Sequence, residues 1–142
     1  MLLLSATAAT AATPVQYRST LNGVCRSYTP KLKALQTSMN KAAKANNPKQ
    51  YGIALGHFLV LALAQDVRLE AQPVPAALRS TMTPILTLLK KIDAHDRLAI
   101  AAAEKGDGKG LVSHLNAIGK LAGPLNPEFD AAGLKDCGSN QS

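Results

Sequence analysis

The segment LNGVCRSYTPKLKALQTSMNKAA, residues 21–43, decides the fold class. Its apolar side chains recur at alternating spacings of four and three residues, which places them on one face of a helix. This spacing predicts a bundle helix that packs on its neighbours at a shallow angle. Pro30 falls outside the apolar face, so we expect a kink there without loss of the buried side. The apolar seam consists of Leu21, Cys25, Tyr28, Leu32, Leu35, Met39 and Ala42.

Similar signals divide the rest of the chain into helices. Helices are predicted over residues 16–45, 48–71 and 75–105, followed by a fourth that ends near Ala122 and by one or two further turns before Gly133. Asn47 and Asp107 are expected to cap the second and fourth helices. The chain is rich in Ala and Leu and only 4% aromatic, and no segment has a strand pattern. Because short connections make neighbouring helices antiparallel, we predict an all-α, up-down-up-down four-helix bundle.

The length of 142 residues allows one domain. Residues 1–12, MLLLSATAATAA, resemble the end of a signal peptide, with a short apolar run followed by small residues. We therefore expect residues 1–12 to be a cleaved remnant and residues 13–142 to form the bundle domain. The alternative is a disordered tail on a cytosolic protein.

The two cysteines lie near opposite ends of the predicted bundle sequence. Cys25 is early in the first helix and Cys137 follows the fourth. In an up-down-up-down bundle these points lie at the same end, so we predict a disulfide with Cα atoms about 5–6 Å apart. The alternative is two separately buried thiols. A zinc site is not supported, because there is no Cys-x-x-Cys motif and no paired histidine nearby.

Four short motifs carry a resemblance. They are LNGVC at residues 21–25, PVPAALR at 73–79, GD at 106–107 and AAGLKDCG at 131–138. In this order the chain resembles small secreted or lipid-anchored four-helix proteins of high-GC bacteria. The resemblance implies export, the bundle and the Cys25–Cys137 pair. It implies no activity and no functional residue.

The second predicted helix is apolar on nearly all sides through Leu63, so we expect it to be the most enclosed. Its longest apolar run, residues 51–64, is shorter than the ~20 residues that a bilayer span needs. We therefore predict a core helix and no transmembrane span. The residues expected in the core are Leu35, Leu55, Leu59, Ile85, Leu89, Ile92 and Leu115.

No pattern in the chain predicts catalysis. The serines lack a nucleophile elbow, and the glycines at 106–110 lack the strand that precedes a phosphate-binding loop. We therefore expect no enzyme activity, no catalytic residue, no cofactor and no metal.

Three histidines and several acidic residues are candidate metal ligands. His57 is expected to be a satisfied core histidine, and His95 and His114 belong to no ligand motif. Asp66 and Glu70 share a face of the second helix and could approach acidic residues of the third, Asp93 or Asp96, which would support a metal-dependent enzyme. The favoured alternative is a set of exposed ion pairs with Arg68, Lys90, Lys91 and Arg97.

The net charge of +7 arises in the first half of the chain. Residues 1–65 contain seven Lys and Arg and no Asp or Glu, whereas residues 66–142 contain nine residues of each sign. A basic face attracts anionic polymers and lipid headgroups. For an exported protein we expect envelope polymers or membrane headgroups as partners and no nucleic acid; the alternative is a solvated, partly neutralised face. The predicted stripe is Arg26, Lys33, Lys41 and Lys44.

These patterns predict one main function and one alternative. The first is a non-enzymatic binding or interaction module of the cell envelope that uses the basic stripe. The alternative is a carrier of a small apolar ligand in the bundle core, with a cavity lined by Gly52, Gly56, His57 and Phe58. A ligand-sized pocket with converging polar groups would favour the carrier, and a tightly filled core would favour the module.

Overall fold

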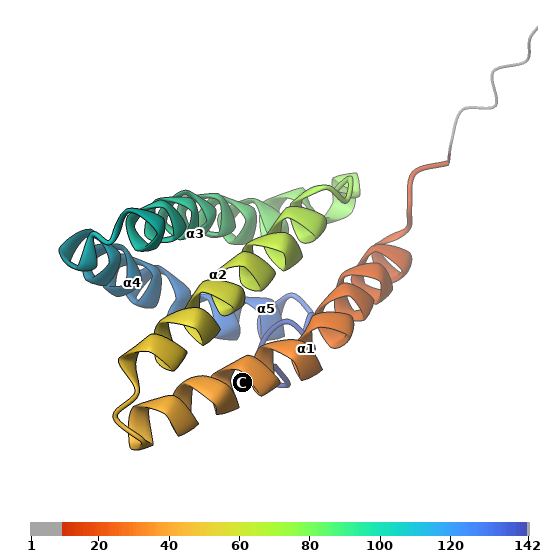
Figure 1. Cartoon of the computed structure of the whole chain (residues 1–142). Helices are drawn as coiled ribbons and strands as arrows, with labels where there is room; N and C mark the ends of the chain where they lie inside the picture. The colour runs from red at the N-terminus through yellow and green to blue at the C-terminus, as the bar shows by residue number, and fades with distance from the viewer. Residues whose placement is uncertain (1–9, 142) are drawn as a thin grey trace, which may run out of the picture.

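The computed structural model describes residues 10–141 and shows an antiparallel helical bundle (Figure 1). The four long helices are α1 (Pro14–Lys44), α2 (Pro48–Glu70), α3 (Arg79–Lys105) and α4 (Gly108–Ala122). A 3₁₀ turn, η1 (Ala76–Leu78), precedes α3, and a short helix, α5 (Leu125–Ala131), follows α4. The structure contains no strand over residues 10–141. Most of the expected signal-peptide remnant, residues 1–9, lies outside the described residues.

The helix starts follow from local capping. Asn47 accepts a hydrogen bond from the backbone N–H of Gln50, and Asp107 accepts one from Gly110, so both predicted caps are confirmed. At the start of α1, the Thr13 hydroxyl and the Gln16 side chain each accept a hydrogen bond from the other residue's backbone N–H. These caps satisfy amide groups that would otherwise lack partners in the first turn.

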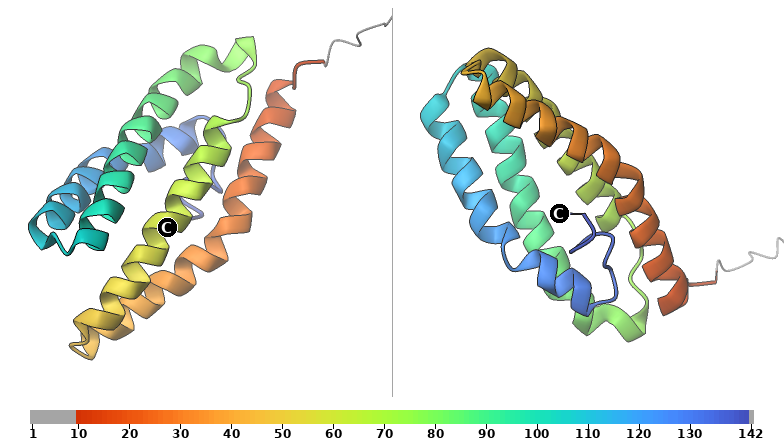
Figure 2. Two further views of the ribbon diagram at one scale, coloured as in Figure 1. Left: turned by 45° about the horizontal axis from the view of Figure 1, so that its top comes forward. Right: turned by 90° about the horizontal axis from the view of Figure 1, so that it is seen from below.

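The helices associate as two hairpins. α1 packs along α2, α3 packs along α4, and the contact between α2 and α3 joins the hairpins. After α5 the chain turns back and lies beside α1 at the disulfide end (Figure 2). Arg18 of α1 donates a hydrogen bond to the carbonyl oxygen of Ala132, and the Asn22 amide donates one to that of Gly133. This C-terminal segment, residues 132–141, therefore helps to close the bundle.

The predicted disulfide is confirmed. Cys25 and Cys137 are bonded with Cα atoms 5.1 Å apart, and both side chains are buried. The bond links helix α1 to the C-terminal segment across 112 residues of sequence. An intramolecular disulfide is typical of proteins that fold outside the reducing cytosol.

The main core lies at the disulfide end and is formed by α1, α3, α5, the C-terminal segment and the last turn of α2. A smaller apolar cluster lies toward the opposite end, around Leu55, Leu59 and Ala99. Of the predicted core residues, Leu35 and Leu115 are only partly buried, and the other five are buried. The largest side chains of the main core include Tyr17, Leu21, Leu69, Met82, Ile85, Leu89, Phe129 and Leu134.

The prediction that the second helix is the most enclosed is wrong. Ile53, Val60 and Val67 are 46%, 55% and 44% exposed and form a row along the outer face of α2. His57 lies on the same face and is exposed, so it is not a core histidine. A helix of a four-helix bundle contacts two neighbours and leaves its outer side uncovered, whatever residues that side carries.

By length and composition α2 is also apolar enough to cross a membrane, with a mean hydropathy of 1.4 in its most apolar window. Core helices of water-soluble proteins meet the same criterion. Here α2 packs on α1 and α3 and places Gln65 and Asp66 inside the bundle.

Candidate functional site

A groove of about 420 Å³ lies between the two hairpins. One wall is formed by Leu55, Phe58 and Leu59 of α2. The facing wall includes Leu115 of α4 and Phe129 of α5. Cys137 and Gln141 of the C-terminal segment form one edge of the groove. The groove is therefore bordered by both hairpins, by α5 and by the disulfide-linked segment.

Polar side chains meet at one part of this apolar groove. Gln65 and Asp66 of α2, Asp96 of α3 and Gln141 all border it. The amide of Gln141 donates hydrogen bonds to the Gln65 side-chain oxygen (2.7 Å) and to the Thr29 hydroxyl (3.2 Å). This small network fixes the end of the chain against both α1 and α2.

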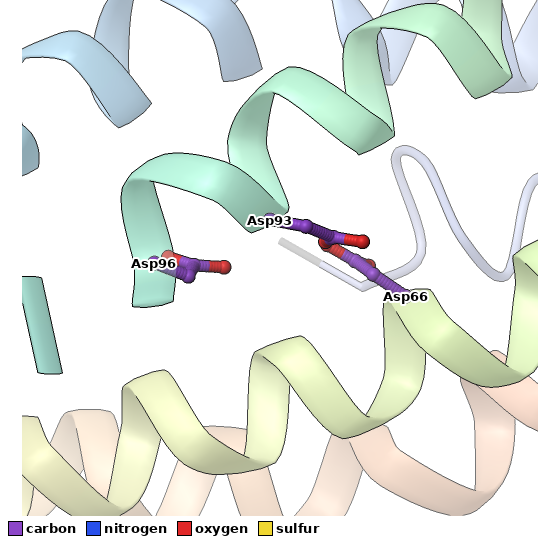
Figure 3. Close-up of side chains that lie close together, drawn as sticks. All are labelled: Asp66, Asp93 and Asp96. Atoms are coloured by element: carbon purple, nitrogen blue, oxygen red, sulfur yellow. The ribbon is translucent and has the colours of Figure 1, made fainter. Parts of the chain in front are cut away.

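Three aspartates form a buried carboxylate cluster, Asp66, Asp93 and Asp96 (Figure 3). One carboxylate oxygen from each lies within 4.8 Å of the other two, and the residues are only 8%, 3% and 2% exposed. Asp93 and Asp96 are three residues apart and share the face of α3 that is turned toward α2. Asp66 approaches them from α2, and in Figure 3 the Asp66 and Asp93 carboxylates point toward one another.

Within residues 10–141, no Lys, Arg or His forms an ion pair with the carboxylate cluster. The only ion pair within residues 10–141 joins Arg26 to Asp136, at the disulfide end. The Asp93 Oδ1 atom is buried and has no hydrogen-bond partner, and the same holds for Glu70 Oε1, which lies one helical turn from Asp66. Two carboxylates about 4 Å apart repel by roughly 4 kcal/mol at an effective dielectric constant of about 20. The cluster therefore retains all its charges only if a cation compensates them.

Burial raises the pKa values of three acids here, Asp66, Glu70 and Asp96. Burial raises the pKa of Asp66 well above its usual value, and the neighbouring Asp93 and Asp96 raise it further. Burial raises the pKa of Asp96 to about 6, against the opposing effect of the Arg97 guanidinium. The pKa of Glu70 rises to about 7 through burial and the proximity of Asp93. Near neutral pH, Asp66, Glu70 and Asp96 therefore bind protons more readily than exposed carboxyl groups do.

The less favoured possibility, an approach of Asp66 to Asp93 and Asp96, is what the structure shows. The favoured prediction of exposed ion pairs is wrong. Within the described part of the chain, no Asp or Glu forms an ion pair with Arg68, Lys90, Lys91 or Arg97. These four basic side chains are exposed, whereas the three aspartates face the bundle interior. Arg68 instead lies over the Tyr28 ring, 5.7 Å from its centre.

The histidines are separate from the carboxylate cluster. His95 and His114 meet across α3 and α4, with their Nδ1 atoms 3.1 Å apart. Neither belongs to the group of residues 66, 93 and 96, and His57 is exposed on α2. The structure thus brings together carboxylates and no nitrogen ligand at this site.

The predicted lining of a ligand cavity is only partly correct. Phe58 borders the groove, but Gly52 and Gly56 border a different hollow, between α2 and the turn that joins α3 to α4. Among the described residues, no atom lies within 4 Å of a Cβ added at either glycine, so no neighbouring helix approaches closely at these positions. Sequence reasoning missed the α4 and α5 wall because it did not foresee where the C-terminal segment lies.

The predicted basic stripe is interrupted at one end. Lys33, Lys41 and Lys44 are exposed on α1, and no ion pair to them occurs within residues 10–141. Arg26 is also exposed but forms the ion pair with Asp136 of the C-terminal segment. The uncompensated charge therefore lies on the half of α1 nearer the α1–α2 turn.

Comparison with protein-family models, with curated proteins and with solved structures gives no match to this chain.

Proposed function

We propose that this protein is an extracytoplasmic carrier that holds a small molecule in the groove between its helix hairpins. The observation that carries the proposal is an apolar groove in which a few polar groups converge at one place. This combination is characteristic of small-molecule sites, which bury an apolar ligand body and fix its orientation through a few polar contacts. The proposal assigns no catalytic step to the protein.

The groove indicates the chemistry of the ligand. Its volume of about 420 Å³ lies within the range of small-molecule pockets. Leu55, Leu59 and Leu115 favour an apolar body, while the carboxyl groups of Asp66 and Asp96 accept hydrogen bonds. We therefore expect a ligand with an apolar body and one end that donates hydrogen bonds.

The test uses the fluorescent probe N-phenyl-1-naphthylamine, which has an apolar body and a single N–H donor. We expect saturable binding with increased probe fluorescence, and we expect Leu115→Trp to abolish it by filling the groove. Val112→Trp is the matched control, because Val112 is on the same helix and is 56% exposed. Far-UV circular dichroism checks that both variants keep their helices. Absence of saturable binding, or equal binding by both variants, would contradict the proposal.

A second candidate function is binding to anionic envelope polymers or lipid headgroups. It is supported by the three exposed lysines of α1, Lys33, Lys41 and Lys44, and by the absence of any Asp or Glu from residues 1–65. Such binding weakens with salt, since the Debye length falls from about 10 Å at 0.1 M to about 3 Å at 1 M.

Vesicles containing anionic lipid, and teichoic-acid polymers, test this second function. Changing all three lysines to Gln should reduce binding with little change in melting temperature, because exposed charges contribute little to stability. The control removes the same charge from three exposed lysines elsewhere, Lys105, Lys109 and Lys120. If the two triple variants bind equally, the α1 lysines form no specific surface.

A further inference from the structure

We propose that Asp66, Asp93 and Asp96 bind a divalent cation, and that the site prefers Ca²⁺ to Mg²⁺. The inference begins with the composition of the carboxylate cluster. Three carboxylates from two helices converge, and no Lys, Arg or His contributes to the cluster. Hard divalent cations bind to carboxylate oxygens, whereas zinc and copper sites in proteins usually include His or Cys.

The separations among the oxygens select among hard cations. Two oxygens bound to one Ca²⁺ at about 2.3–2.6 Å lie at most about 5 Å apart, whereas two bound to Mg²⁺ at about 2.0–2.1 Å lie at most about 4 Å apart. The three ligand oxygens here lie within 4.8 Å of one another. A span of up to 4.8 Å suits Ca²⁺, whose coordination shell is wide and flexible, better than Mg²⁺, which demands a compact and near-ideal octahedral shell. The preference for Ca²⁺ follows from this difference.

An unpartnered atom gives a second indication. Asp93 is 3% exposed, and its buried Oδ1 atom has no hydrogen-bond donor among the described residues when Asp66 and Glu70 are ionised; the protonated carboxyl groups of those two acids are the competing partners of the Asp93 side chain. Its carboxylate points toward Asp66, into the space between α2 and α3 (Figure 3). Buried polar atoms in folded proteins nearly always have a partner, so this oxygen is available as a ligand to a cation held between the helices.

The site also has an entry path. Asp66 and Asp96 border the groove, which is open to solvent, so an ion with bound water molecules reaches the carboxylates from that side. Water molecules in the groove complete the coordination, because Ca²⁺ takes six to eight oxygen ligands. The cation site does not depend on the carrier function, since it requires only these aspartates and water.

The test is calorimetric titration of the whole disulfide-bonded chain with CaCl₂ and, separately, with MgCl₂. We expect one Ca²⁺ per chain with a dissociation constant below about 1 mM, as in other extracellular calcium modules, and Mg²⁺ binding at least about tenfold weaker. Ca²⁺ should also raise the melting temperature of the wild-type protein.

Two variants and one control locate the site. Asp93→Asn and Asp96→Asn each remove one ligand charge while keeping the shape of the side chain, and we expect each to weaken Ca²⁺ binding at least about tenfold. Glu104→Gln makes the same change at an exposed position of α3 and should bind as the wild type does. Circular dichroism of the two Asn variants should show wild-type helicity.

Three results would overturn the inference. The first is the absence of both saturable Ca²⁺ binding and a melting-temperature shift in the wild-type protein up to about 10 mM, which would show a cluster neutralised by protons alone. The second is unchanged Ca²⁺ affinity in both Asn variants. The third, Mg²⁺ binding as tight as Ca²⁺ binding, would overturn the stated preference. Probe binding to the groove without added Ca²⁺ is measured independently, so the cation site and the carrier function can fail separately.

Discussion

Asp96 occupies a position that the sequence of α3 assigns to the core. The spacing of Met82, Ile85, Leu89 and Ile92 continues through residue 96 to Ala99, and all six residues are buried. The periodicity therefore indicates that this acidic side chain faces inward, whereas its charge alone predicts a solvent-exposed position. Asp66 shows the same conflict between an acidic side chain and a buried position, and it lies four residues from Glu70 on the same helix. Sequence periodicity locates such residues, but only the packed structure shows that they meet.

The raised pKa of Asp96 predicts how stability depends on pH in the presence of a chelator. Its usual value is 3.8 and its value in the folded chain is about 6, so between these values the folded state binds more protons than the unfolded state. The contribution of Asp96 to the free energy of unfolding is therefore fully present below about pH 4 and is lost as pH rises toward about 6. The raised pKa of Glu70 extends this loss toward pH 7. Urea unfolding of the metal-free protein should show a higher free energy of unfolding at about pH 5 than at about pH 7.5.

Asp96→Asn should flatten this pH dependence and stabilise the metal-free protein at neutral pH, because it removes the buried charge while keeping a polar group of similar size. Glu104→Gln, at an exposed position of the same helix, should keep the wild-type dependence. A free energy of unfolding that increases between pH 5 and 7.5 in the metal-free wild type would contradict the assigned direction.

Helix α2 shows what composition does and does not determine about an element. Its boundaries, Pro48–Glu70, agree closely with the prediction because Asn47 and Pro48 give a strong helix start. Its environment was predicted incorrectly, because an all-round apolar sequence does not reveal how many neighbours cover the helix. The structure leaves Ile53, Val60 and Val67 exposed, and Gly52 and Gly56 are uncrowded.

The two glycines of α2 give a prediction for this element. Gly52→Ala and Gly56→Ala should each stabilise the protein by about 0.5–1 kcal/mol, because Ala favours the helix and the added methyl group meets no atom within 4 Å. Urea unfolding measures the change. Gly106→Ala provides the contrast: it should destabilise the protein, because Gly106 ends α3 with a φ of +72°. A loss of stability in both α2 variants would contradict this prediction.

At the scale of the whole molecule, the topology was predictable because the helix count and the cysteine positions agree. Four helices joined by short connections place Cys25 and Cys137 at one end, and the bond is formed there. The groove was not predictable, because it depends on the path of residues 132–141, which carry no periodic pattern. Hydrogen bonds from Arg18, Asn22 and Gln141 fix that path, and such contacts over more than 100 residues leave no mark in local sequence.

Removal of the disulfide should affect stability and the groove together. In the chain-entropy model, a bond that closes about 100 residues stabilises a protein by about 4–5 kcal/mol. The Cys25→Ala/Cys137→Ala double variant should lose stability of this order in urea unfolding and should bind N-phenyl-1-naphthylamine more weakly, because Cys137 and Gln141 border the groove. Treatment of the wild type with dithiothreitol should reproduce both effects. A loss below about 1 kcal/mol would show that the segment is held mainly by its hydrogen bonds.

The separation of 112 residues between the bonded cysteines also sets an order of events during synthesis. Each helix hairpin is built from neighbouring segments and can form as soon as those segments emerge from the ribosome or from a membrane pore. The Cys25–Cys137 bond, and with it the edge of the groove formed by Cys137 and Gln141, cannot form until residue 137 has emerged. Nascent chains are thus expected to display paired helices before the groove is complete, and an oxidising catalyst can form this disulfide only after residue 137 has emerged.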